Sequence, residues 1–249
     1  MKNIEKKLSV LNGSLIKYIA IACMLSDHIA YCFVPPDTIL HQIMRFFGRI
    51  TAPIMCFFLT EGFHHTHDLK KYFMRMIAFA FISQIPFSFC FAGNPFAVFK
   101  SGFSVITTLT VTLGALTVYH NEKIKREYKL PIIMLLGLAA SYSDWGINLM
   151  LFTFCFEFAR GDLKKQCIAY SAAALYYVFP TIYSYVTMCI QNGEIGFFKS
   201  FYKLGIFMPI LLISAYNGKR GGGKNGKWIF YIFYPAHLLV IALIRFRCT

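Results

Sequence analysis

The chain has 249 residues, of which 57% are hydrophobic, 18% aromatic and only 14% charged. A soluble domain carries about 25% charged residues, and one core of this length cannot hide so much apolar surface from water. Together with a mean hydropathy of +0.55, the composition excludes a disordered, fibrous or ordinary cytosolic protein. It indicates a chain whose main solvent is lipid.

Apolar runs suited to spanning helices recur along the whole chain. A span needs about 20 mainly apolar residues, or fewer where its end lies against protein. The runs predict an all-α, polytopic integral membrane protein that forms a single domain over residues 1–249. About nine transmembrane helices are expected, within a range of eight to ten, at 15–34, 45–63, 72–92, 103–119, 131–143, 146–158, 167–189, 204–215 and 228–246. The short runs between 131 and 158 form either two short helices or one broken helix.

Lys and Arg are distributed unequally among the predicted loops. Alternate loops, counted from the N-terminus, hold 16 of the 25 Lys and Arg residues, whereas the intervening loops hold 5. Because cytoplasmic loops are enriched in Lys and Arg, the N-terminus is predicted to be cytoplasmic. The net charge of +14 is then mainly a topology signal and not a nucleic-acid site. We expect a multi-pass protein of the cell (cytoplasmic or inner) membrane.

Patterns that suggest metal or nucleotide binding are incomplete in this chain. The eight cysteines include no CxxC or CxxH pair, and the histidines of residues 64–67 have no fourth ligand at a suitable distance. Residues 218–225 match GxxxxGK, but Asn225 follows the lysine and no strand precedes the motif. We therefore predict no metal and no P-loop. A cationic loop that contacts the phosphates of a cofactor is the alternative for this segment.

Ionisable residues inside predicted spans are costly in lipid and are candidate functional residues. Lys17 and His28 are separated by eleven positions, which places them about 16 Å apart along a helix and on the same side. Lys17 is expected near the cytoplasmic face and His28 near the middle of the membrane. A buried, neutral imidazole is a suitable general base. A histidine that only packs against a neighbouring helix is the alternative.

Four more charged residues lie in or near the predicted outer ends of spans. Asp27 projects about 100° away from His28, so we expect it to pair with another helix and not with that ring. Arg45 and Arg49 share one helical face, and snorkelling to the interface is their alternative role. Asp144, in an outer segment, is expected either to pair with Arg49 or to attract a cationic acceptor.

Two predicted helices carry a proline beside polar side chains. Ser83 and Gln84 precede one proline, and Tyr234 and His237 flank another. Proline removes a backbone hydrogen bond and kinks a helix. These side chains therefore either satisfy freed backbone groups or belong to a functional site.

The motifs resemble a known family. Lys17, ten intervening residues and His28 resemble the first-helix Arg/Lys-x10-His motif of the membrane acyltransferase (acyltransferase 3-like) superfamily. Other motifs are similar to those of the TraX family, conjugation-associated proteins that acetylate the N-terminal amine of pilin: Arg45-x-x-Gly48-Arg49, Pro53, Glu61-Gly62-Phe63, Thr66, Tyr72-x-x-Arg75, Ser83-Gln84-x-Pro86 and Phe233-Tyr234-Pro235-x-His237. The resemblance runs from about Gly13 to His237 and is weak between 100 and 200, apart from Asp144.

The resemblance implies a membrane-bound, acetyl-CoA-dependent acetyltransferase. It implies that acetyl-CoA binds from the cytoplasm and that the acceptor, a pilin-like or exported peptide amine or a glycan or lipid hydroxyl, lies at the outer side. His28 is the implied base, with His237 as substitute, and Arg49 and Arg45 stabilise the oxyanion or hold Asp27. The implied cofactor-binding residues are Lys17, Arg75, Glu61 and Tyr72, and the implied substrate-binding or supporting residues are Ser83, Gln84, Asp144, Tyr234 and His237.

Two other functions are compatible with buried charges. A proton-coupled transporter uses intramembrane His, Asp and Arg, but it predicts inverted repeats, and no such symmetry is visible in the sequence. A structural component of a secretion or conjugation assembly would use the charges only to join helices. The expected partners are the lipid bilayer, acetyl-CoA and an exported peptide or glycan, and not nucleic acid.

Overall fold

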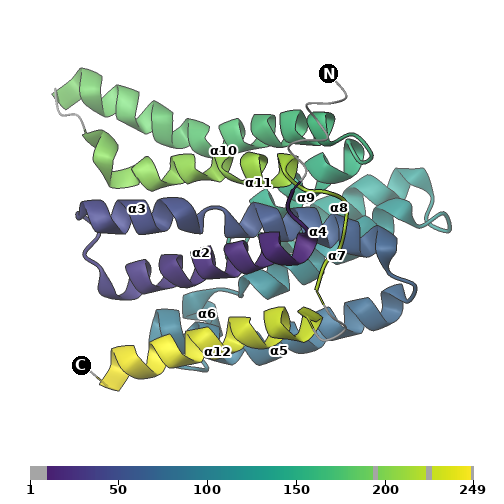
Figure 1. The fold of residues 1–249 in the computed structure, drawn as a ribbon, viewed down its shortest axis with the longest axis horizontal. Helices are drawn as coiled ribbons and strands as arrows, with labels where there is room; N and C mark the ends of the chain where they lie inside the picture. Colours follow the sequence, from purple (N-terminus) through teal and green to yellow (C-terminus); the bar gives the residue numbers. More distant parts are fainter. Residues whose placement is uncertain (1–9, 193–195, 223–225, 248–249) are drawn as a thin grey trace. The chain divides into compact units, whose positions relative to one another are not determined.

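The structure, a computed structural model, describes residues 10–192, 196–222 and 226–247 (Figure 1). The predicted all-α fold is confirmed, because the described part of the chain contains helices and no strand. The chain divides into two compact units. The first unit comprises Met1–Met55 and Cys155–Gly226, and the second comprises Cys56–Phe154 and Lys227–Thr249.

The first unit is built from parallel rows of helices. Its elements are α2 (Gly13–Phe33), α3 (Ile39–Gly48), the start of α4 (Thr51–His65), α10 (Leu163–Asn192), the 3-10 helix η1 (Gly196–Phe207) and α11 (Pro209–Ser214). Figure 1 shows α2, α3, η1 and α10 side by side in that order, and neighbouring members of this series are in contact. Helix α3 is therefore packed between α2 and η1.

The second unit contains most of α4 and most of α9 (Ile147–Phe158). It also contains α5 (Leu69–Ala92), α6 (Val98–Ser101), α7 (Val105–His120), α8 (Arg126–Ala140) and α12 (Gly226–Arg247). Helix α7 packs against α5 and α8. Helix α12 lies along α5 (Figure 1), where Phe79 stacks on Tyr231 and Phe89 stacks on Phe246.

Side-chain caps fix where several helices begin. The carboxamide of Asn12 accepts a hydrogen bond from the Leu15 amide at the start of α2, and Thr38 caps α3 in the same way. The Asp68 carboxylate accepts a hydrogen bond from the Lys71 amide at the start of α5. The residue after the last one of α5 is Gly93, which has a left-handed φ of 73°. Each cap satisfies an amide that has no partner within its helix, so the local sequence defines these boundaries.

The helices indicate a membrane protein, although fewer of them than predicted are long enough to span alone. Four meet the length and hydropathy of a membrane span: Gly13–Phe33, Ile39–His65, Leu69–Ala92 and Trp228–Arg247. The other predicted segments fall on α7 to α11 and η1, several of which are short and apolar. Residues 131–158 form two helices, α8 and α9. The count of nine spans and the cytoplasmic N-terminus stay predictions.

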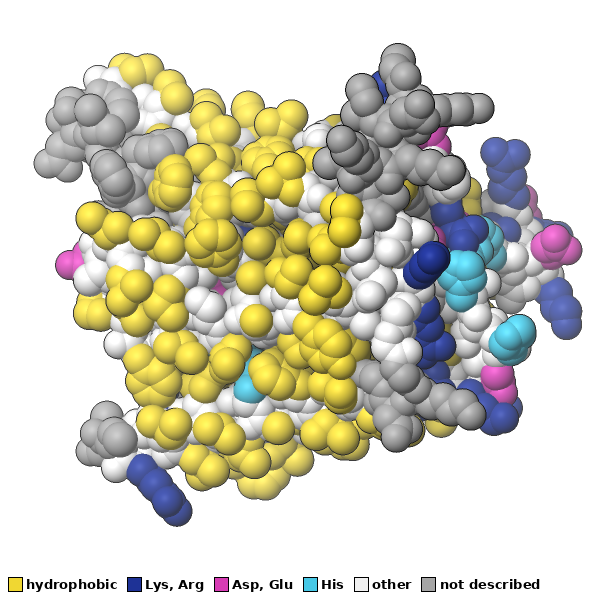
Figure 2. Space-filling model, in the orientation of Figure 1, with side chains coloured by type: hydrophobic (Ala, Val, Ile, Leu, Met, Phe, Trp, Pro, Cys, Tyr) yellow, Lys and Arg dark blue, Asp and Glu magenta, His cyan; other side chains and the backbone are white. Residues whose placement is uncertain are grey.

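Large apolar side chains are exposed on both units. Hydrophobic atoms cover most of the face drawn in Figure 2, and few Lys and Arg atoms lie among them. On α10, Tyr176 and Phe179 are 67% and 63% exposed, and on α12, Ile232 and Val240 are 58% and 55% exposed. Soluble proteins seldom expose contiguous apolar surface on this scale, so these faces are suited to contact with lipid.

A glycine permits the close approach of η1 to α3. A Cβ atom added at Gly205 would overlap the carbonyl oxygen of Phe46. The rings of Phe46 and Phe201 stack beside this contact, with their centroids 5.6 Å apart. The Tyr170 hydroxyl donates to the Ile206 carbonyl at 2.5 Å and holds η1 on its other side to α10. The position of η1 therefore depends on having glycine, which has no side chain, at residue 205.

Replacing this glycine should disturb the first unit. We expect Gly205→Ala to lower the free energy of unfolding by about 1–3 kcal/mol, because backbone atoms must move apart. Gly114→Ala in α7 is the matched control, since its Cβ would meet Phe73 ring atoms at an ordinary 3.8 Å. Thermal unfolding of both variants in detergent checks the prediction, and equal melting temperatures would contradict it.

Candidate functional site

One carboxylate and two guanidinium groups form a buried ion cluster in the first unit. Nη2 of Arg49 lies 2.8 Å and 2.7 Å from the two carboxylate oxygens of Asp27. Nε of Arg45 lies 3.1 Å from one of the same oxygens. The three side chains are only 9–14% exposed. The expectation that Asp27 pairs with another helix is confirmed.

The end of α3 is shaped to receive the Asp27 side chain. Arg45 lies in the last turn of α3, and Arg49 caps the helix with its amide, which donates to the Arg45 carbonyl at 3.2 Å. A Cβ atom at Gly48 would overlap the Asp27 side chain. Glycine at this position therefore lets α2 approach closely enough for one carboxylate to reach both arginines.

Aromatic rings complete the cluster. The guanidinium carbons of Arg45 and Arg49 lie 4.8 Å and 5.4 Å from the ring centroid of Tyr202 in η1. Tyr31 in α2 lies 5.2 Å from the Arg45 guanidinium. A cation over an aromatic face is stabilised electrostatically, so these rings support two cations that share one anion. Sequence reasoning missed both tyrosines, although Tyr31 is on the same helical face as Asp27, four residues later.

His28 lies beside this cluster in the sequence and is 8% exposed. The structure therefore buries this imidazole one residue along α2 from Asp27, whose carboxylate pairs with the arginines. Burial of this ring agrees with the expectation for a mid-membrane base, whereas its catalytic role stays a prediction.

Lys17 lies at the other end of α2, near a cationic loop. The amides of Gly13 and Ser14 donate to the carbonyls of Lys219 and Arg220 at 2.8 Å and 2.9 Å. This contact brings Arg220 into electrostatic range of Lys17. The structure thus joins two cationic segments that the sequence assigned separately to the cytoplasmic side.

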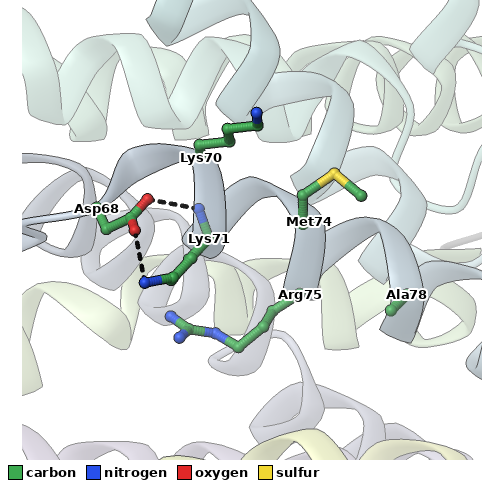
Figure 3. Close-up of a pocket in the computed structure, with 6 residues that line it drawn as sticks. All are labelled: Asp68, Lys70, Lys71, Met74, Arg75 and Ala78. Atoms are coloured by element: carbon green, nitrogen blue, oxygen red, sulfur yellow. Dashed lines mark hydrogen bonds and ion pairs between the residues drawn. The ribbon is translucent and has the colours of Figure 1, made fainter.

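A cavity of about 630 Å³ lies at the start of α5 in the second unit. Its lining includes Asp68, Lys70, Lys71, Met74, Arg75 and Ala78 (Figure 3). Figure 3 shows Lys71 and Arg75 extending to the same side of the helix, with Lys71 bound to Asp68. Hydrogen bonds from the Lys71 amide and ammonium lower the pKa of the Asp68 carboxyl, so this residue stays ionised as a helix cap.

Arg75 is the most buried cation of this cavity wall. Its Nε atom is buried and has no hydrogen-bond partner within the described residues. The guanidinium carbon lies 5.8 Å from the ring centroid of Tyr72. Glu61, the fourth residue implied in cofactor binding, lies 3.3 Å from Nε2 of His65. The lining of this cavity combines the cations of Lys70, Lys71 and Arg75 with the apolar side chains of Met74 and Ala78. Such a lining is suited to an anionic ligand with a nonpolar part.

Gln84 connects α5 to the segment before α7. Its amide nitrogen donates to the carbonyl of Gly102 at 2.9 Å and to the Ser88 hydroxyl at 3.1 Å, and its amide oxygen accepts from the Ser104 amide at 3.0 Å. Gln84 therefore satisfies backbone groups of another segment. The Ser83 hydroxyl is buried and accepts or donates no hydrogen bond within residues 10–192, 196–222 and 226–247.

The remaining predicted residues gather near the start of α7 and on α12. The Asp144 amide donates to the Phe103 carbonyl at 2.8 Å. Tyr234 is 3% exposed and lies in electrostatic range of Asp144. Nδ1 of His237 lies 2.7 Å from the Phe233 carbonyl oxygen. A hydrogen bond from Nδ1 leaves Nε2 as the acceptor atom of this ring.

Comparisons with known proteins give a consistent picture. The family model described as TraX protein matches residues 12–245. The chain is 31% identical over 241 residues to the "Probable fimbrial assembly protein FimC, serogroup H1" of Dichelobacter nodosus. That alignment covers 91% of this chain and 92% of the relative. No solved structure matches the chain.

The ion cluster yields a prediction about stability. Asp27→Asn removes the negative charge that the buried guanidinium groups of Arg45 and Arg49 both contact. We expect a loss of about 3–5 kcal/mol, as for other buried pairs that lose one partner. Asp162→Asn is the control, because Asp162 is an exposed cap at which Asn serves equally well. Chemical unfolding in detergent micelles measures both, and similar midpoints would refute the importance of the cluster.

Proposed function

The chain belongs to the TraX protein family, and from this premise we propose that it is an acetyltransferase of the inner membrane. The acetyl group moves from acetyl-CoA on the cytoplasmic side to an acceptor on the outer side, in the first place the N-terminal amine of a pilin-like or exported peptide. The name of the relative, which concerns fimbrial assembly, supports an acceptor of this kind. The observation that carries the proposal is that the buried Asp27–Arg45–Arg49 cluster and the buried imidazole of His28 belong to the same unit.

Acetyl transfer from a thioester makes three chemical demands. The amine attacks the thioester carbonyl, a carbon–nitrogen bond forms, and the carbonyl oxygen becomes an oxyanion. When the oxyanion collapses, the carbon–sulfur bond breaks and the CoA thiolate leaves. A base must accept the proton of the amine, donors must stabilise the oxyanion, and water must be excluded. No metal is required for any of these steps.

Residues of the first unit match these demands. His28 is a buried imidazole and takes the proton, which then becomes available to the departing thiolate. The guanidinium groups of Arg45 and Arg49 stabilise the oxyanion in this proposal, while Asp27 holds them in place. Asp27 is a positioning residue in this scheme.

The cavity at the start of α5 is suited to acetyl-CoA. Its volume of about 630 Å³ lies within the usual range for ligand sites, about 300–1,000 Å³. Lys70, Lys71 and Arg75 are suited to bind phosphates, and Met74 offers an apolar surface to the pantetheine arm. Lys17 and Arg220 form a second cationic group on a segment predicted to be cytoplasmic.

A structural role in fimbrial assembly is the second candidate, favoured by the name of the relative. In that case the ion cluster only joins α2 to α3. The two functions differ in one observable property, because an assembly protein consumes no acetyl-CoA.

The test of the proposed function is the loss of the base. We expect His28→Ala to lower kcat for acetyl transfer to a peptide by about 10²–10⁴-fold while acetyl-CoA binding is retained. His67→Ala removes an exposed imidazole and is the matched control. Turnover and a binding isotherm are measured on the same purified preparation. Near-normal turnover of His28→Ala would end its assignment as the base, and a folded wild-type protein without turnover would favour the assembly role.

A second prediction concerns the cofactor cavity. Arg75→Gln should raise KM for acetyl-CoA about tenfold, because a charged hydrogen bond to phosphate is lost. The value of kcat should change little, since phosphate contacts are the same in the ground and transition states. Arg126→Gln, at an exposed position on α8, should leave both constants unchanged. A fall in kcat at constant KM would place Arg75 outside the cofactor site.

A further inference from the structure

The segment before α9 is held in an unusual backbone conformation. The Phe103 amide donates to the Tyr142 carbonyl at 3.2 Å, and the Thr108 hydroxyl donates to the Asp144 carbonyl at 2.9 Å. Trp145, the next residue, has φ of 64°. A bulky side chain seldom adopts this left-handed conformation, which persists only where the surroundings impose it. The position of Asp144 is thus fixed from both sides, at a cost in backbone energy.

The Tyr234 hydroxyl lies near Asp144 and the start of α7. This side chain is 3% exposed. Its oxygen faces the backbone at Val105 and lies in electrostatic range of Asp144, yet no described residue forms a hydrogen bond of good geometry with it. A buried hydroxyl without a partner costs free energy. A ligand with an acceptor atom at this position would supply the missing bond.

The start of α7 adds backbone donors. Ser104 occupies the N-cap position, but its side chain makes no capping hydrogen bond. The Ser104 hydroxyl lies instead 3.3 Å from the Thr107 hydroxyl. The first amides of a helix have no acceptor within the helix, and the partial positive charge there favours an oxygen ligand. Tyr234 and the first turn of α7 therefore present donors beside the carboxylate of Asp144.

A ligand that fits these groups has a cation and a carbonyl oxygen close together. We propose that Asp144, Tyr234 and the first turn of α7 form the recognition site for the N-terminal residue of the peptide acceptor. Asp144 binds the α-ammonium group, and the Tyr234 hydroxyl donates to the first carbonyl oxygen. This inference rests on the proposed function and narrows its acceptor to a peptide amine. A glycan or lipid hydroxyl offers Asp144 no cation.

The test measures peptide binding without acetyl-CoA, so that it is independent of turnover. The probes are a short fluorescent peptide with a free N-terminal amine and the same peptide with an acetylated amine. Purified full-length protein should bind the free-amine peptide about tenfold more tightly, the effect of one charged hydrogen bond. Asp144→Asn should abolish this preference, and Asp144→Glu should restore part of it. Asp37→Asn, another carboxylate in a predicted outer segment and an exposed one, should keep the preference.

Tyr234→Phe provides a second, independent readout. Removing a buried hydroxyl that has no described hydrogen-bond partner should raise the melting temperature of the ligand-free protein while affinity for the free-amine peptide falls several-fold. A lower melting temperature or an unchanged affinity would show that Tyr234 is structural and would overturn the site.

The two proposals fail in different ways. Equal binding of both peptides by the wild-type protein, or a preference that survives in Asp144→Asn, overturns the recognition site even if acetyl transfer occurs. Amine-dependent binding that needs Asp144, in a protein that transfers no acetyl group, supports the site and contradicts the proposed enzyme.

Discussion

The carboxylate of Asp27, shared by Arg45 and Arg49, is the interaction on which the first unit depends. Each of these charges is costly to remove from water, and their mutual pairing offsets much of that cost. The pairing requires α2 to approach the end of α3 at Gly48, and it places the two cations under the ring of Tyr202. Packing, charge and the proposed chemistry therefore depend on the same few atoms.

Features that depend on neighbours along one helix were predictable from the sequence. The shared face of Arg45 and Arg49 follows from their spacing, and the angle between Asp27 and His28 indicated a partner on another helix. Tyr202 was missed because its position depends on the packing of η1 against α3, about 150 residues away in the chain. The helix break near residue 208 was also missed, because hydropathy does not show that the apolar run at 204–215 is divided between η1 and α11.

The polar side chains near the prolines show the same limit. The sequence placed Gln84 beside a kink but left its partner open, and the structure gives it Gly102 and Ser104. The motif resemblance identified the family, and the comparisons confirm it. The proposed reaction assigns the base and the guanidiniums to the first unit, and the cationic cavity and the recognition site to the second. Family membership alone would not have divided these tasks.

Transfer across a membrane is the most direct test of the central claim. The purified protein is reconstituted in lipid vesicles that enclose a peptide with a free N-terminal amine, and isotopically labelled acetyl-CoA is added outside. Mass spectrometry then measures labelled acetyl groups on the enclosed peptide. The account predicts labelled peptide inside the vesicles, in amounts that depend on the protein. No label on the enclosed peptide, with folded protein and intact vesicles, would contradict it.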